Sequence, residues 1–198
     1  MSTDKVDKPT VLAFWGSNSS QSINGRLLRF TASLFSKVNV KVIDLRDFSL
    51  PLFGVDLERE QGHPEEAKAL KKLIKESDGI LMSLAEHNGG YTAFFKNALD
   101  WISRLEGKAW ENKPIFLMGA SDGRRGARSV ITMAENRIPF NGGRVIHTFS
   151  FPTFHENFSG DEVTNEELLS NLKELVDSFE KKILEENNVL SEDQLFQT

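Results

Sequence analysis

Short apolar runs alternate along the chain with longer segments in which apolar residues recur at helical spacing. The runs are rich in β-branched and aromatic residues and do not alternate with polar ones, which is typical of strands buried on both faces of a sheet. They predict strands at residues 10–15, 39–45, 78–84, 113–119 and 143–149. The segments between and after them predict helices at residues 22–36, 64–76, 92–105, 127–138 and 164–186.

Two of these predicted helices carry a recognisable start signal. Pro64 stands where the second helix begins, and proline suits the first helical position because that residue needs no N–H partner. Thr164 is followed three residues later by Glu167, which is the spacing of a capping box. We therefore expect helices to begin at or next to these residues.

The order of the predicted elements is five βα units in succession, which indicates an α/β protein with a parallel sheet between two helical layers. Right-handed crossovers leave few topologies. The leading one is the flavodoxin-like three-layer sandwich with strand order 2-1-3-4-5, whose ligand lies beyond the carboxyl ends of the strands. We expect residues 1–198 to form a single domain of this fold, with flexible tails at 1–9 and 187–198.

Composition narrows the class of protein further. The chain has 198 residues, 39% of them hydrophobic and 27% charged, as in folded globular proteins. Its net charge of −5 argues against nucleic acid and anionic membranes as partners. The absence of cysteine excludes disulfides and thiolate catalysis. The polar start MSTDKVDKP shows no signal peptide and no apolar run reaches the length of a membrane span, so we predict a cytoplasmic protein.

The loop after the first strand reads GSNSSQSIN and opens a helix. A helix N-terminus has unpaired N–H groups and a dipole that favours an anion, so this arrangement is suited to a phosphate. The loop lacks the Walker ending and the GxGxxG pattern, and it has no Lys or Arg, so its donors would be neutral. An ordinary polar loop with a serine N-cap is the alternative. The candidate donors are Ser17, Ser19, Ser20, Ser22 and Asn24.

Two more loops follow the third and fourth strands and should converge on the same edge of the sheet. Residues 85–91 read AEHNGGY, in which Glu86 and His87 are either an acid–base pair or polar residues of a solvent-facing turn. Residues 119–126 combine glycines with Arg124 and Arg125. These arginines either bind a phosphate of a nicotinamide dinucleotide or form a solvated basic patch.

The sequence motifs do not indicate a hydrolase or a metal-dependent enzyme. The histidines are scattered, HExxH is absent, and no GxSxG elbow is present. We therefore predict no metal site and assign no catalytic side chain.

Taken together, the loops resemble the NADPH-dependent FMN reductase family over about residues 10–150. The resemblance rests on GSxxxxSxN from residue 16, on KNALDW at residues 96–101, and on GASxG at residues 119–123. FSLPL at residues 48–52 also looks like the family's loop after the second strand. KNALDW is the most specific of these motifs.

The resemblance implies noncovalently bound FMN, with hydride transfer from NADPH or NADH to the flavin and then to a flavin, quinone, azo compound or metal oxyanion. It places the flavin phosphate at Ser17, Ser22 and Asn24, and it implies a homodimer or homotetramer that uses the KNALDW helix. The cofactor-binding residues that we expect are Gly16, Ser17, Ser19, Ser22, Ile23, Asn24, Glu86, His87, Asn88, Gly89, Gly90, Ser121, Asp122, Gly123 and Arg124.

This chain departs from the family pattern at two places. Ser19 stands where the family usually has an arginine, and residues 85–88 read Ala-Glu-His-Asn in place of Pro-Glu-Tyr-Asn. Two alternative functions therefore stay open. One is a flavodoxin-type electron carrier, and the other is a flavin-free binding domain of the same fold.

Overall fold

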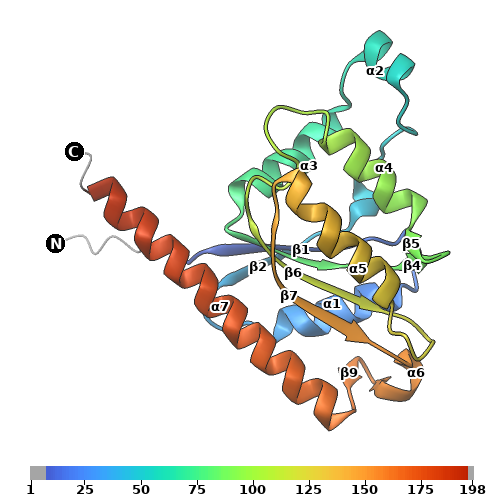
Figure 1. Cartoon of the computed structure of the whole chain (residues 1–198), viewed down its shortest axis with the longest axis vertical. Helices are drawn as coiled ribbons and strands as arrows, with labels where there is room; N and C mark the ends of the chain where they lie inside the picture. The colour runs from blue at the N-terminus through green and yellow to red at the C-terminus, as the bar shows by residue number, and fades with distance from the viewer. Residues whose placement is uncertain (1–7, 196–198) are drawn as a thin grey trace.

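The computed structural model describes residues 8–195, with side chains up to residue 188. Its centre is a parallel sheet in the order β2-β1-β3-β6-β7 (Figure 1). This order is the predicted 2-1-3-4-5, and the flavodoxin-like fold is confirmed. The strands are β1 (Thr10–Trp15), β2 (Asn39–Val42), β3 (Gly79–Ser83), β6 (Pro114–Ala120) and β7 (Arg144–Phe151).

Helices cover both faces of the sheet, so that the strands separate two apolar cores (Figure 1). Leu12 and Phe14 of β1 face the core beneath α3, α4 and α5, whereas Val11, Ala13 and Trp15 face the core beneath α1 and α7. This alternation follows from the pleat of the strand. The helices are α1 (Ile23–Ser33), α3 (Glu65–Glu76), α4 (Ala93–Ile102), α5 (Arg128–Arg137) and α7 (Glu166–Leu195).

Burial on both faces holds for the central strands but is wrong for β2, and β7 at the opposite edge is only partly buried. Every residue of β3 and β6 is buried, whereas β2 is largely exposed. The reason is position, because β2 lies at the edge of the sheet and pairs only with β1. It also ends at Val42, earlier than predicted, and the chain turns into the 3-10 helix η1 (Leu45–Asp47).

Two predicted helix starts are wrong by about one residue. Pro64 is the N-cap of α3 and lies outside the helix, with an extended ψ of 144°. At α7 the capping residue is Asn165 and not Thr164, because the Leu168 N–H donates to Asn165 Oδ1 at 3.1 Å. Asn165 is held in place by Asn157, whose Oδ1 accepts from its Nδ2.

The structure contains several short elements that the hydrophobic pattern did not predict, and one helix is longer than expected. The predicted tail 187–198 is helical through Leu195, and residues 1–7 and 196–198 lie outside the described part. Within residues 8–195 we find no helix long and apolar enough to span a bilayer. The additional elements are α2 (Val55–Gln61), β4 (Glu86–His87), β5 (Gly90–Tyr91), η2 (Ile138–Asn141), α6 (Phe154–Asn157), β8 (Phe158–Ser159) and β9 (Glu162–Val163).

The segment that carries α2 stands out from the body and is anchored on α4 (Figure 1). The Phe53 N–H donates to Asn97 Oδ1 at 2.7 Å, and the Trp101 indole N–H donates to the Pro51 carbonyl at 2.7 Å. The Phe53 ring also meets Trp101 edge-on at 5.1 Å. Trp101 of KNALDW is therefore a core residue, and the segment at 48–54 packs against it.

Candidate functional site

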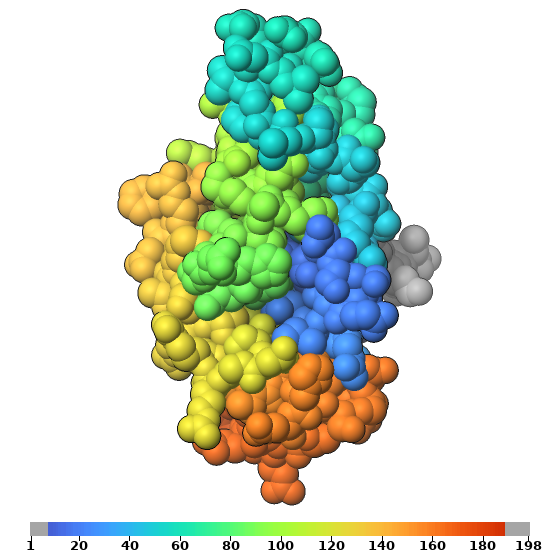
Figure 2. Space-filling model, turned by 90° about the vertical axis from the view of Figure 1, so that its right-hand side faces the viewer, coloured from blue at the N-terminus to red at the C-terminus, as the bar shows by residue number. Residues whose placement is uncertain are grey.

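The three loops predicted from sequence meet at the carboxyl edge of the sheet. Figure 2 looks onto this edge, where the blue, green and yellow segments of the loops lie side by side. Between them is an open cavity of about 290 Å³. It is lined by Ser17, Ser19, Gln21, Ser22, Ile23, Asn24, Ala85, Glu86, His87, Ala120, Ser121 and Asp122.

Most of the predicted cofactor-binding residues are among those lining residues, and some are not. Gln21, Ala85 and Ala120 are not among the predicted residues, because their side chains carry no charge, although each adjoins a predicted residue in sequence. The predicted residues that do not line the cavity are Gly16, Asn88, Gly89, Gly90, Gly123 and Arg124.

The serine loop is held in place by its own hydroxyl groups. Ser17 Oγ accepts from the Ser19 N–H, Ser19 Oγ accepts from the Gln21 N–H, and Ser22 Oγ accepts from the Gly25 N–H, each at 3.2 Å. The last of these bonds is the N-cap of α1. A hydroxyl that accepts still has a proton to donate. The loop therefore presents hydroxyl donors beside the N-terminus of α1, as an anion site requires.

The Asn24 side chain lines the cavity and is also largely committed to hydrogen bonds within the fold. It is 2% exposed. Its Oδ1 accepts from the Ala120 N–H at 2.8 Å and from the Ser83 hydroxyl at 2.9 Å, while its Nδ2 donates to the Ala120 carbonyl at 3.1 Å. Asn24 thus joins α1 to the ends of β3 and β6 and positions the cavity.

Gly16 is likewise explained by packing. A Cβ at this position would lie 3.0 Å from Leu84 Cδ2 and 3.1 Å from Phe95 Cβ, so Leu84 and Phe95 would have to shift to accommodate it. The Gly16 N–H donates to the Ser83 carbonyl, and its own carbonyl accepts from the Thr92 hydroxyl. The glycine allows the start of α4 to approach the loop.

The second loop is a hairpin in which β4 and β5 flank a turn at Asn88 and Gly89. Both turn residues have positive φ, 52° and 75°, which is the geometry that Asn-Gly favours between two strands. The Asn-Gly dipeptide is the sequence feature from which this hairpin could be predicted. Tyr91 packs edge-on against Phe95, and burial raises the pKa of Tyr91 to about 12.

Glu86 does not form a pair with His87 in the structure. Its Oε2 accepts from the backbone N–H of Val130 in α5 at 3.0 Å. His87 is exposed on the hairpin. The carboxylate is therefore engaged in holding another part of the chain, and of the two alternatives for Glu86 and His87 the described geometry shows no acid–base pair.

The third loop is folded tightly against β7. The Ser121 hydroxyl accepts from the Ala127 N–H at 3.2 Å, and the Ser150 hydroxyl donates to the Gly126 carbonyl at 2.7 Å. Gly126 has a φ of 56°, and a Cβ there would lie 2.4 Å from Ser150 Oγ. Only glycine fits this position, so the loop has a defined shape.

The charged groups of this loop point in different directions. Asp122 forms an ion pair with His155 at 3.2 Å, and both side chains are exposed. Arg125 donates to Ser129 Oγ at 2.9 Å, and Arg124 is exposed. The arginines are therefore beside the cavity and do not line it.

The chemistry of the lining decides which ligands the cavity could hold. Its lining residues, all of them described, include the carboxylates of Glu86 and Asp122 and no Lys or Arg. A phosphate would therefore be held by hydroxyl groups, backbone N–H groups and the dipole of α1, as the loop sequence predicted. This donor set suits the phosphate of FMN, and the hairpin and the third loop supply a wall on either side for a flat ring.

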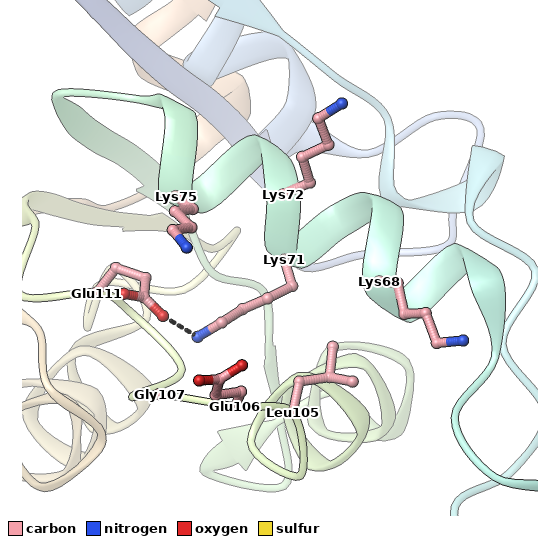
Figure 3. Close-up of a pocket in the computed structure, with 8 residues that line it drawn as sticks. All are labelled: Lys68, Lys71, Lys72, Lys75, Leu105, Glu106, Gly107 and Glu111. Carbon is pink, nitrogen blue, oxygen red and sulfur yellow. Dashed lines mark ion pairs between the residues drawn. The ribbon is translucent and has the colours of Figure 1, made fainter.

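A second, larger cavity of about 490 Å³ lies between α3 and the chain after α4. Figure 3 shows Lys71 and Lys75 directed toward Glu111, with Glu106 on the other side of Lys71, while Lys68 and Lys72 extend away. Lys71 is 8% exposed and pairs with Glu111 at 2.5 Å. The Lys71–Glu111 ion pair therefore joins α3 to the chain after α4 at this cavity. Across residues 8–195 no three His, Asp or Glu side chains gather as a metal site.

Comparison with known proteins agrees with the geometry. Residues 9–156 match the NADPH-dependent FMN reductase family. A quinone reductase of Escherichia coli K12 is 30% identical over 149 residues, which cover 69% of this chain and 79% of that protein. A 2-hydroxy-1,4-benzoquinone reductase of Burkholderia sp. is 36% identical over 113 residues, covering 56% and 60%. The solved structure of FerB, a flavoenzyme NAD(P)H:(acceptor) oxidoreductase from Paracoccus denitrificans, has a TM-score of 0.72 at 29% identity and covers 89% of this chain and 98% of that one.

Proposed function

Because the chain belongs to the NADPH-dependent FMN reductase family and is an NAD(P)H-dependent oxidoreductase, we propose that it binds FMN at the three-loop cavity and reduces small quinones. The observation that carries this proposal is the meeting of a serine loop, a hairpin and an arginine-flanked loop at the switch point of the sheet. Relatives named as quinone reductases support a quinone as the acceptor.

The protein's part in such a reaction is binding and orientation. The bound flavin supplies the redox chemistry, by accepting a hydride from the nicotinamide and passing electrons to the acceptor. The hydroxyl groups of Ser17 and Ser22 would donate to the phosphate of FMN, and the start of α1 would add its dipole. The hairpin at 86–91 and the loop at 121–123 would flank the ring and limit the access of water. The cavity is open, which leaves room for a nicotinamide or a quinone.

The first test is titration of the apoprotein with FMN, followed by flavin fluorescence and absorbance. We expect saturation at one FMN per chain. Stopped-flow mixing with NADPH and then a benzoquinone should show rapid flavin reduction and reoxidation. A failure to saturate at micromolar protein would contradict the proposal, and binding without direct reduction by NADPH or NADH would indicate an electron carrier.

Arg124 and Arg125 are proposed to bind a phosphate of the nicotinamide dinucleotide. Both lie on the loop beside the cavity without lining it, so they suit the second ligand better than FMN. A charge-assisted hydrogen bond contributes about 1.5–3 kcal/mol, so Arg124→Ala or Arg125→Ala should raise the KM for NADPH about tenfold or more. Steady-state kinetics measures this, with Arg137→Ala at the far end of α5 as control. An unchanged KM in both variants would mean that the assignment is wrong.

We propose that the chain forms a homodimer, or a homotetramer built from it. The helix at 92–105 is largely covered within its own chain, but two exposed apolar side chains, Leu52 and Val55, lie on the segment packed against it. Leu52 is 81% exposed and Val55 is 65% exposed. A partner is expected to cover them.

Light scattering should report more than one chain per particle for the wild type and a single chain for Leu52→Glu. Phe140→Glu, an equally exposed apolar position on η2, is the matched control. A wild-type monomer at high concentration would exclude the oligomer, and dissociation by the control alone would place the interface elsewhere.

A further inference from the structure

Helix α5 begins without a capping side chain of its own. Its N-cap position is held by Ala127 in the left-handed conformation, with a φ of 60°, and a methyl group cannot accept a hydrogen bond. The first turn of any α-helix has N–H groups without partners inside the helix. Partners for these groups must therefore come from elsewhere in the fold.

The missing cap is supplied by Glu86, which is 44 residues earlier in the chain. Its Oε2 accepts from the N–H of Val130 at 3.0 Å. Val130 is the third residue of α5, and its N–H is one that an N-cap side chain would ordinarily bind. A carboxylate at this end of a helix is also stabilised by the helix dipole.

This bond joins two walls of the same cavity. Glu86 belongs to β4 of the hairpin, and Val130 follows directly on the loop that contributes Ser121 and Asp122. That loop is connected to α5 through the Ala127 N–H, which donates to the Ser121 hydroxyl. The position of Ser121 and Asp122 relative to the hairpin therefore depends on where the start of α5 is held.

We propose that Glu86 is a positioning residue that sets the distance between the hairpin wall and the 121–127 wall of the cavity. The inference deepens the proposed function and rests on it for the identity of the ligand. Glu86 acts through α5, so its carboxylate is needed as a hydrogen-bond acceptor and not as an acid or base.

The first test needs no flavin. Amide hydrogen exchange of the apoprotein is compared between wild type, Glu86→Ala and Glu86→Gln, with Glu135→Ala on the exposed side of α5 as control. Glu86→Ala should speed exchange about tenfold or more at Val130 and also at Ala127. Glu86→Gln retains an acceptor and should stay close to wild type. If exchange is unchanged, or changes at Val130 alone, the positioning role is overturned.

The second test uses the ligands. Glu86→Ala should raise the Kd for FMN and the KM for NADPH about tenfold, while Glu86→Gln keeps both within about threefold and retains its kcat. If Glu86→Gln loses kcat while its amide exchange stays normal, the carboxylate acts in the chemistry and the positioning role is overturned. A wild-type protein that binds no FMN but shows the expected exchange pattern would overturn the proposed function and leave the role of Glu86 in the loops supported.

Discussion

Asn24→Ala is expected to lower the free energy of unfolding by about 3 kcal/mol or more. The substitution removes the partner of the Ala120 N–H, the Ala120 carbonyl and the Ser83 hydroxyl together. Ser83 is fully buried and Ala120 nearly so, which keeps water from replacing the lost bonds. Each buried polar group left without a partner costs about 1–3 kcal/mol.

Urea denaturation of the apoprotein measures the loss, and Asn18→Ala is the matched control because Asn18 is an exposed residue of the same loop. Asn24→Ala should also weaken FMN and riboflavin by similar factors, since it displaces the ends of β3 and β6 around the whole cavity. A variant as stable as the wild type, with weakened FMN and unchanged riboflavin, would mean that Asn24 binds the phosphate directly.

Ser17→Ala is expected to weaken FMN about 10- to 150-fold and to leave riboflavin nearly unchanged. The Ser17 hydroxyl is 7% exposed, lines the cavity and accepts from the Ser19 N–H, so it is held in one orientation. A hydrogen bond to a charged group contributes about 1.5–3 kcal/mol, which corresponds to that range. Because Ser19 replaces the arginine that the family usually has, the effect should lie toward the upper end.

Parallel fluorescence titrations with FMN and riboflavin provide the measurement for Ser17→Ala. Ser20→Ala is the control, since Ser20 belongs to the same loop but is exposed and does not line the cavity. Equal losses for the two flavins would show that the substitution disturbs the loop as a whole, or that the phosphate is bound elsewhere.

The pattern of apolar residues determined the architecture of this protein. Each buried strand is a local run of apolar residues, and each helix a local periodicity, so both can be recognised without knowing what they contact. Five such pairs in succession leave few sheet orders, and β2-β1-β3-β6-β7 is the leading one among them. The exposed strand β2 differs because a position at the edge of a sheet is a property of the whole fold.

The sequence also determined where the site would be, since the carboxyl ends of parallel strands meet at one edge, and which loops would form it. The tertiary structure alone decided what Asn24 and Glu86 do there. Asn24 bonds to groups 59 and 96 residues away, and Glu86 to a group 44 residues away. A polar side chain in a loop has the same local sequence whether it meets a ligand or a distant backbone group. Its role depends on which partner the fold brings within about 3 Å.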